Sequence, residues 1–521
     1  MSDPDLTVLL PASAAIPDAP GPVLRDWMLS GRFVGARDPT TAEALGSFLG
    51  AGTPAPLDLW FGVDAARRLR LDADALRCAI DRDIAAIDAL ISDQLDAVLH
   101  HGRMRRLEGA WRGLAWLVGG ADLSRRVRIK VFNAGWAEIC RDLERAIEFD
   151  QSQLFLKVYE QEFGTPGGEP YGLLVVDHEV RHRPAPGHPT DDVTALAGLS
   201  GVAAAAFAPV VLGASPSLLE VDGFADLAPV ADVTAPLRNP EHARWRSLAG
   251  RTDMRFVGLT LPRLLARPPW EDDGTRTDLF RYAEATPDAE SRVWMSAGYA
   301  FAAVVVRAFA AFTWPADVRG VETDRIGGGL IENLPVEPFR TDPDRVWVRP
   351  SIEIVLTGRQ EQDLLAAGLM PVTALRFSEE LAFGAVRGLL APPRHQGANA
   401  GAAEANERLS VQMNSILCVS RFAHHLKMKG REMVGSFKTA DEMQRLLQAW
   451  LMRYVNANLS ATGDARARFP LVDGRVAVQE IPGKPGSFGC TVHLQPHYQL
   501  DDVAASIQLV TELGSGNGRR P

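Results

Sequence analysis

Residues 171–182 spell Tyr-Gly-Leu-Leu-Val-Val-Asp-His-Glu-Val-Arg-His, an apolar run that passes into a polar one. The apolar part, Tyr171 to Val176, is short and rich in branched side chains, which is typical of a buried strand. A helical pattern from Asp191 follows and leads into a second apolar run at Val210–Leu212. Strand and helix patterns that alternate in this way predict an α/β region.

The same alternation continues on both sides of this region. Runs typical of strands, Arg255–Leu261 and Val348–Leu356, flank an apolar helix pattern at Val293–Phe312. Upstream, Arg126–Phe132 alternates strictly, which predicts a strand with one basic face. That face either meets an acidic partner or is solvated. The predicted fold class is therefore α/β in the broad sense, a mixed α+β arrangement of helices and sheet.

A long amphipathic helix is predicted from Asp72 onward, because apolar residues recur there at spacings of three and four. A second helical stretch, Met104 to Leu117, follows it. A narrow apolar stripe on a long helix suits packing against another helix, either of this chain or of a partner. The stripe consists of Ile80, Ile84, Ile87, Ile91, Leu95 and Val98.

Composition shifts divide the chain into four predicted parts. Residues 1–70 form an N-terminal arm, 71–390 a main domain, 391–405 a Pro-, Gly- and Ala-rich linker, and 406–521 a C-terminal domain. Within the last part, two alternating stretches predict a hairpin over 475–495. Its open edges suit strand addition by other chains. The apolar candidates for that interface are Val476, Val478, Val492 and Leu494.

Charge and cysteine content restrict the kind of partner and compartment. The 521 residues carry a net charge of −10, which argues against nucleic acid as the main partner. Four scattered cysteines without a CxxC pair are typical of buried thiols in a reducing compartment. Met1–Pro22 has no pattern of a secretory signal. The apolar stretches Val193–Gly213 and Val293–Val306 suit buried elements better than membrane spans. We expect a cytoplasmic bacterial protein without membrane insertion.

One motif offers an enzymatic alternative. His178-Glu-Val-Arg-His182 matches the HExxH signature of zinc metalloproteases, in which two histidines one helical turn apart bind the metal and the glutamate activates water. That chemistry needs a helix, yet a strand-like run precedes His178, and Pro184, Pro186 and Pro189 follow His182. We therefore expect a strand and a loop. No other pattern predicts a catalytic residue, a cofactor or a metal.

Several segments resemble, in order, the landmarks of one family. That family is the large subunit of the contractile sheath of type VI secretion systems, TssC (VipB, ImpC), and the resemblance covers roughly residues 80–512. The segments are Leu107–Leu114 (LEGAWRGL), Ser152–Phe155, Tyr159–Gly164, Gly167–Gly172, Arg255–Arg263 (RFVGLTLPR), Trp314, Arg319-Gly320, Gly327–Gly329, Leu334-Pro335, Ser420–Ser436 and Leu494–His497.

The resemblance implies a structural protein and not an enzyme. Members pair with a small sheath subunit (TssB/VipA-like), polymerise with copies of themselves around an inner tube (Hcp-like) on a baseplate, and contract. The fold implied is that of contractile-sheath proteins, with terminal arms that exchange strands between protomers. A disassembly ATPase (ClpV-like) recycles the contracted form. We expect it to recognise Val23, Leu24, Trp27 and Met28 in the arm.

Overall fold

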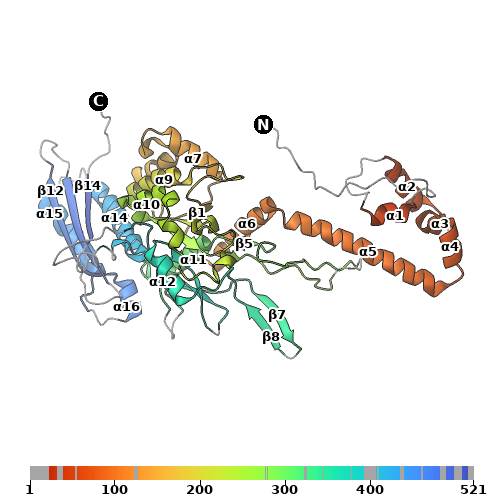
Figure 1. Ribbon diagram of the computed structural model, residues 1–521. Coiled ribbons are helices and arrows are strands. Elements are labelled where there is room, and N and C mark those ends of the chain that lie inside the picture. The colour runs from red at the N-terminus through yellow and green to blue at the C-terminus, as the bar shows by residue number, and fades with distance from the viewer. Residues whose placement is uncertain are drawn as a thin grey trace. The chain divides into compact units, whose positions relative to one another are not determined.

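The computed structural model contains both helices and strands, which confirms the mixed α/β fold class (Figure 1). Its contacts divide the chain into two compact units, Met1–His101 with Pro269–Ala285, and Gly102–Pro268 with Thr286–Pro521. The structure describes residues 23–31, 39–52, 55–122, 127–275, 277, 280–321, 326–343, 345–376, 378–391, 407, 410–433, 439–458, 462–481, 488–497 and 507–513. The predicted linker, 391–405, lies outside these ranges except for residue 391.

The first unit is helical, and its longest element is the helix predicted from Asp72. Asp72 is the N-cap of this helix, since its carboxylate accepts hydrogen bonds from the backbone amides of Asp74 and Ala75. Shorter helices precede it. The helices are α1 (Leu24–Leu29), α2 (Pro39–Gly50), α3 (Ala55–Phe61), α4 (Val63–Leu69) and α5 (Ala73–Leu99).

One buried carboxylate ties the short helices of this unit to α5. Asp83, 3% exposed, accepts hydrogen bonds of 2.7 Å from both Nε and Nη2 of Arg25 on α1. It also accepts the indole N–H of Trp60 on α3 at 2.9 Å. Burial opposes ionisation of Asp83, but these donors outweigh it and hold its pKa below the usual range.

The segment Pro269–Ala285 belongs to the same unit, where it runs beside α5. The phenol of Tyr282 donates to Asp96 at 2.5 Å, and His100 lies 3.2 Å from the Glu284 carboxylate. Glu284 in turn accepts the backbone N–H of Trp270 at 2.9 Å. Polar contacts therefore attach an extended segment to the C-terminal half of a helix nearly two hundred residues earlier in the chain.

The second unit is built on a parallel sheet of four strands in the order β1-β2-β3-β9. The apolar run that begins at Tyr171 enters β1, which continues through His178 and Glu179 to Val180. The predicted helix from Asp191 and the apolar run at Val210 become the crossover α9 and β2. The strands are β1 (Leu174–Val180), β2 (Val210–Ala214), β3 (Val257–Leu261) and β9 (Met370–Pro371).

Both faces of this sheet are covered by helices. Leu212 packs in the same apolar cluster as α9 (Asp192–Ala206), whereas its neighbour Val211 packs with α11 (Ala297–Phe312). Successive side chains of a strand point to opposite faces, so each helix covers one face. All five residues of β2 are buried as a result, and so are all five of β3. Of the described helices, none is long and apolar enough to cross a membrane.

Further short elements surround α9. Helices α7 and α10, the π-helix η3 and the 3-10 helices η2 and η8 pack against it. Their bounds are α7 (Trp136–Arg145), η2 (Phe149–Gln151), α8 (Gln153–Phe155), η3 (Leu156–Gly164), η4 (Pro216–Leu219), η5 (Phe224–Leu227), η6 (Ala235–Arg238), η7 (Pro240–His242), α10 (Ala243–Ala249) and η8 (Thr252–Phe256).

Helix α6 (Gly102–Gly120) packs against β5 and α11 through small residues. A Cβ at Gly109 would lie 2.1 Å from the carbonyl oxygen of Trp294, and one at Gly113 would lie 2.5 Å from the ring of Tyr299. Neither position leaves space for a side chain. The helix therefore approaches its neighbours at a distance that only glycine permits at these two positions.

Small antiparallel sheets complete the main body. They form the three-stranded sheet β10-β11-β6 and the pairs β4-β5 and β7-β8. Helix α12 (Gly358–Ala366) precedes β9. The strands are β4 (Leu264–Leu265), β5 (Trp294–Met295), β6 (Leu330–Ile331), β7 (Glu337–Asp342), β8 (Arg345–Arg349), β10 (Thr373–Ala374) and β11 (Leu381–Ala382).

The C-terminal part packs a three-stranded antiparallel sheet, β12-β13-β14, against helices. Val492 and Leu494 of its central strand share one apolar cluster with Phe422 and Leu447 of the helices. A third strand thus joins the two that the sequence pattern predicts. The elements are α14 (Met413–Met433), α15 (Ala440–Leu451), η9 (Met452–Tyr454), α16 (Gly463–Arg468), β12 (Leu471–Glu480), β13 (Phe488–Pro496) and β14 (Ile507–Leu513).

Helix α14 is also attached to η3 through polar side chains. The ammonium group of Lys427 donates to the phenol oxygen of Tyr159 at 2.6 Å and lies 4.1 Å from the ring centroid of Phe163. Arg431 donates to the carbonyl oxygen of Phe163. The family-like segments Tyr159–Gly164 and Ser420–Ser436 are therefore in mutual contact where described.

The strand predicted at Arg126–Phe132 is wrong for its described residues, 127–132, which are extended but unpaired. Their basic side chains form ion pairs with acidic residues of the same chain instead. Arg128 donates to Glu169 at 2.5 Å, and Lys130 to Glu162 at 2.6 Å. Val127 and Ile129 are half-buried but Val131 is 65% exposed, so the alternation does not mark one covered face of a strand.

Replacing Gly109 by alanine tests the close approach of α6. The added methyl group must push against the backbone of β5, so we expect a loss of about 1–3 kcal/mol and a lower thermal midpoint. Gly119→Ala on the same helix is the control, because no atom lies within 4 Å of its Cβ position. That variant should be unchanged or stabilised by up to about 1 kcal/mol. Equal midpoints for the two variants would contradict the packing described.

Candidate assembly surfaces

The HExxH-like segment lies in β1 and the loop after it, and its side chains point to separate partners. His178 Nε2 lies 3.0 Å from the Asp192 carboxylate, and its ring stacks on Trp136 with centroids 4.4 Å apart. His182 stacks on His242 instead, with centroids 3.9 Å apart. Two ligands one helical turn apart require a helix, and a strand does not bring them together. Among the described residues no cluster of three or more His, Cys, Asp or Glu side chains could hold a metal. The metalloprotease alternative is not supported.

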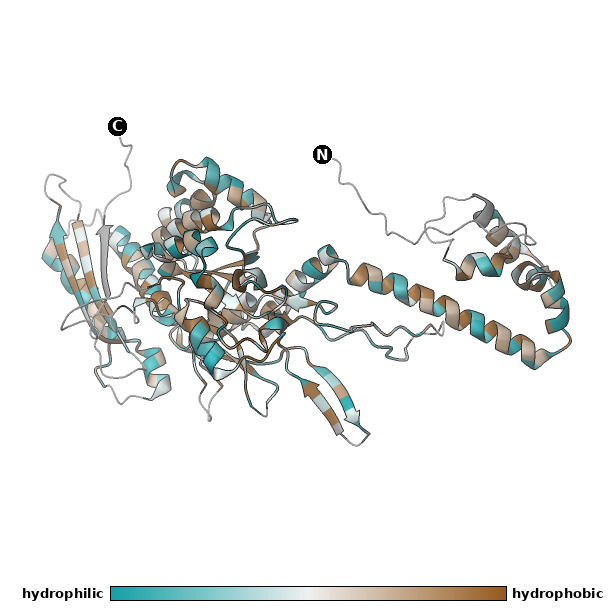
Figure 2. Cartoon of the chain, in the orientation of Figure 1, coloured by the Kyte–Doolittle hydropathy of each residue, from teal (hydrophilic) through white to brown (hydrophobic). Residues whose placement is uncertain are grey.

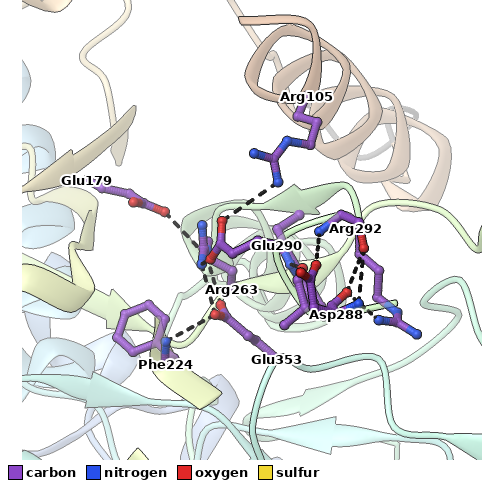
Figure 3. A network of polar contacts seen from close by, with 11 residues as sticks. Arg105, Glu179, Phe224, Arg263, Asp288, Glu290, Arg292 and Glu353 are labelled. Atoms are coloured by element: carbon purple, nitrogen blue, oxygen red, sulfur yellow. Dashed lines mark hydrogen bonds and ion pairs between the residues drawn. The ribbon is translucent and has the colours of Figure 1, made fainter. Parts of the chain in front are cut away.

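Glu179 of the same motif faces a charged cluster around Arg263, shown in Figure 3. Arg263 follows β3 and donates to both carboxylate oxygens of Glu353, at 2.7 and 2.8 Å. It also lies 3.1 Å from Glu290 and 3.8 Å from Glu179. Burial opposes the charge of Arg263, but its hydrogen bonds to Glu353 and the charges of the other carboxylates raise its pKa above the usual value.

This cluster is a structural junction. Glu353 also accepts the backbone N–H of Phe224 at 3.1 Å, and Arg105 of α6 lies 3.7 Å from Glu290. The cluster therefore connects segments that are distant in the sequence. Removing one partner of such a buried pair is costly, because the other charge is left without compensation. The arrangement holds these segments together.

The family-like segment Leu107–Leu114 is bound by a second buried arginine, Arg267. Arg267, 5% exposed, donates to Glu108 of α6 at 2.7 Å, and Arg112 donates to the same oxygen at 2.7 Å. Burial opposes the charge of Glu108, but the two guanidinium groups hold its pKa below the usual range. On the other hand, Trp111 is 62% exposed. The motif therefore combines internal contacts with an uncovered aromatic residue.

In the first unit the predicted stripe on α5 is largely exposed. Figure 2 shows apolar residues recurring along this helix. Ile84 is 51% exposed and Val98 is 60% exposed. Ile80, Ile91 and Leu95 are also exposed, and Ile87 is half-buried. The structure thus gives the stripe no full cover within the described part of this chain.

The residues expected to meet the ATPase lie on or beside α1. Leu24 is buried, whereas Val23, Trp27 and Met28 are half-buried. The indole nitrogen of Trp27 is buried without a hydrogen-bond partner. Because Arg25 binds Asp83, α1 is docked on the unit and its apolar side chains are not fully accessible. Capture of this helix by another protein would require that contact to open.

The four candidates in the C-terminal sheet lie in the core of this chain. Val476 and Val478 on β12 are 5% and 6% exposed, and Val492 and Leu494 on β13 are fully buried. They pack in the cluster of α14 and α15. Their side chains are therefore already covered, and what the sheet can offer another chain is its backbone edges.

The two edges of this sheet differ. On β12, the side chain of Gln448 donates to the carbonyl oxygen of Gly474 at 2.8 Å and accepts from the amide of Val476 at 2.8 Å. Gln444 accepts from the amide of Val478 at 3.0 Å. These amides from α15 occupy the positions that a neighbouring strand would fill. The β12 edge is closed in this way, and β14 forms the opposite edge. No sequence pattern predicted that glutamine side chains of α15 would bind the β12 edge.

Sequence reasoning missed the hairpin β7-β8, whose two strands form a separate sheet. Phe339 and Trp347 pair across it and are 40% and 46% exposed. Glu337 at its base accepts two hydrogen bonds of 2.8 Å from the buried Arg292. The alternation in Arg345–Arg349 was the available signal, but the prediction placed a strand at Val348–Leu356 instead. A two-stranded hairpin is marginal by itself, so its anchored base is important.

Comparison with known proteins agrees with this picture of a scaffold with uncovered surfaces. Residues 81–389 match the family described as EvpB/VC_A0108, tail sheath N-terminal domain. Residues 402–513 match EvpB/VC_A0108, tail sheath gpW/gp25-like domain. The chain is 35% identical over 447 residues to the type VI secretion system sheath protein TssC1 of Pseudomonas aeruginosa, covering 85% of this chain and 87% of that protein.

A mixed α/β protein whose longest helix has an exposed apolar stripe is typical of the structural proteins that assemble with partners. The chain belongs to the TssC/VipB family of large sheath subunits of type VI secretion systems. This is a family of structural sheath proteins and not one of enzymes. The resemblance found in the sequence landmarks is thereby confirmed.

Asp83→Ala tests how α1 is held. The change leaves the Arg25 guanidinium and the Trp60 N–H without their acceptor, at a cost of about 1–3 kcal/mol. We expect hydrogen exchange of the α1 amides to speed up about tenfold or more. The control is Asp81→Ala, at an exposed position on α5 close to Asp83, which should leave the exchange of the α1 amides unchanged. If α1 keeps its protection in the Asp83 variant, the ion pair does not hold it.

Buried His424 predicts an acid-sensitive core. It is fully buried on α14, its Nε2 lies 2.9 Å from the Ala206 carbonyl oxygen, and burial lowers its pKa to about 4. In the unfolded chain this histidine takes up a proton as the pH falls through about 6.5, whereas in the native chain it stays neutral down to about pH 4. The free energy of unfolding therefore decreases as the pH drops below 6.5, and the decrease is complete below pH 4. Between pH 7.5 and 5 this costs about 2 kcal/mol.

Thermal midpoints at these two pH values measure the effect. His424→Gln keeps a donor for Ala206 but does not titrate, and we expect a smaller drop between pH 7.5 and 5 than in the wild type. His493→Gln, at an exposed position on β13, is the control and should show the wild-type drop. A drop of equal size in all three proteins would exclude His424 as the cause.

Proposed function

We propose that this chain is the large subunit of a type VI contractile sheath that pairs with a small subunit (TssB/VipA-like) and polymerises in the bacterial cytoplasm. The polymer surrounds an inner tube (Hcp-like), is anchored on a baseplate, and drives delivery of effectors by contracting. The observation that carries this proposal is the family relationship, which spans both the main body and the C-terminal part. The related protein is named a sheath protein of a type VI secretion system.

The α5 stripe is our proposed contact for the small subunit. Each isoleucine or leucine that passes from half-exposed to buried contributes about 1 kcal/mol, so the six residues together supply several kcal/mol. A helix of the partner that presents a matching stripe would cover them by side-chain interdigitation. The 27 residues of α5 provide length for more than one such layer.

Strand addition is our proposed link between protomers. A strand from a neighbouring subunit would add to the β14 edge, because the β12 edge already binds Gln444 and Gln448. The candidates Val476, Val478, Val492 and Leu494 then support the sheet from its core side rather than touching the neighbour. Main-chain hydrogen bonds of this kind keep subunits connected while the packing between them changes.

Contraction requires two packings of the same subunits that differ by a modest free energy. Rigid bodies joined by extendable links satisfy this requirement. The doubly covered sheet and the Arg263 cluster supply rigidity within the second unit. The sheet edge supplies a link. After contraction, we propose that the ClpV-like ATPase captures α1 through Val23, Leu24, Trp27 and Met28 once the Arg25–Asp83 contact opens.

Co-expression with the cognate small subunit tests the proposed function. Wild-type chains should yield long hollow tubes in negative-stain electron microscopy. A double variant, Ile84→Asp with Ile91→Asp, places charges in the stripe and should reduce co-purification of the small subunit at least about tenfold. Its own fold should persist, since both side chains are exposed.

The matched control is Ala89→Asp with Ala97→Asp. These exposed positions are rotated by about 140° from the stripe on α5, so the same charge is added to another face. Tubes and co-purification should be unaffected. A wild-type chain that stays monomeric beside its small subunit would overturn the proposal, and loss of binding in the control would show that the stripe is not the contact.

A further inference from the structure

A cleft of about 670 Å³ opens beside the end of the HExxH-like segment. Its lining includes His182, Arg183, Glu220, Asp222 and Glu241, and three of these five side chains are carboxylates. Arg183 pairs with Glu241. Among the described residues, Glu220 and Asp222 have no lysine or arginine partner.

The imidazole of His182 is the unusual feature of this cleft. The residue is only 4% exposed, yet neither ring nitrogen has a hydrogen-bond partner among the described residues. Buried polar groups in folded proteins are almost always paired, because an unpaired one costs about 1–3 kcal/mol. Burial lowers the pKa of His182 to about 4, so the ring is neutral near pH 7. A neutral ring retains one nitrogen that can accept a hydrogen bond.

A second buried imidazole lies next to it. His242, fully buried and stacked on His182, has its Nε2 3.1 Å from the carbonyl oxygen of Leu218. That contact places a proton on Nε2. Nδ1 of the same ring lies 3.7 Å from Oε1 of Glu220, which is beyond hydrogen-bond distance. The Glu220 carboxylate and the two stacked imidazoles are therefore neighbours.

The backbone at Glu220, on the rim of the cleft, has a conformation that is unfavourable for a residue with a side chain. Glu220 has φ of 57°, in the left-handed region, where a residue with a Cβ costs about 1 kcal/mol or more relative to glycine. Its carboxylate accepts the side-chain amide of Asn239 at 3.2 and 3.3 Å. Asp222 is exposed and makes no hydrogen bond or ion pair in the described part of the chain. Both residues line the cleft.

We propose that this cleft is a socket for a cationic side chain, a lysine or arginine, of a neighbouring subunit in the assembly. The carboxylates of Glu220 and Asp222 bind the charge, and the buried imidazole of His182, which lines the same cleft, supplies an acceptor. A metal ion is a poorer occupant, since no described cluster has three suitable ligands. An anion is excluded by the charge of the rim. The inference rests on the proposed function, because it needs an assembled neighbour.

The test neutralises the socket without changing its shape. Glu220→Gln with Asp222→Asn removes both charges, and glutamine can still accept from Asn239. The matched control is Glu144→Gln with Glu148→Gln, which removes two exposed charges elsewhere in the same unit that make no ion pair in the described structure. Circular dichroism and thermal midpoints establish that both variants fold.

Two measurements follow. Agmatine, which carries a guanidinium group, is titrated into the wild-type chain by calorimetry, and the socket variant should lose affinity about tenfold or more while the control does not. Co-expression with the small subunit is scored for tubes by negative-stain microscopy. We expect about tenfold fewer tubes from the socket variant and normal numbers from the control.

The outcomes are distinguishable. If the wild type forms no tubes, the proposed function fails, and the agmatine titration still decides whether the cleft binds cations. If agmatine binds the wild type and the socket variant equally, the socket is overturned. If agmatine binding is lost but tubes form normally, the cleft binds a cation that is not a neighbouring subunit, and the docking proposal is overturned.

Discussion

Burial of both faces of the parallel sheet is the constraint on which the rest of this structure depends. The strands β2 and β3 have no polar face, so each needs cover on two sides, and α9 and α11 provide it. The apolar surface removed from water in this way is the main favourable term for the body. Every other element of the second unit is attached to this three-layer core or to the helices around it.

Buried charges add specificity to that core rather than net stability. Arg263, Arg267 and Asp83 each bind partners from distant parts of the sequence. Replacing such pairs by apolar residues is often neutral, whereas breaking one is costly. These clusters therefore select one arrangement of loops and helices.

What the fold leaves uncovered is as informative as what it buries. The stripe of α5 is apolar and exposed, and carboxylates line the cleft beside His182. By contrast, Gln444 and Gln448 close the β12 edge, which limits unwanted pairing there. Exposed apolar side chains gain free energy when a partner covers them, so the α5 stripe is a surface that can contribute to association.

The sequence by itself determined the mixed fold class, the long helix α5 and the strand-helix-strand order around β1, because these depend on local periodicity. It also excluded a helix through His178 and His182 from the flanking residues. Only the tertiary structure decided that Arg128 and Lys130 meet Glu169 and Glu162 of the same chain, that Val476 and Leu494 face inward, and that His182 lies beside an acidic cleft. Periodicity reports which face of an element is apolar. Which distant residue covers that face depends on contacts across hundreds of positions, and no local pattern encodes them.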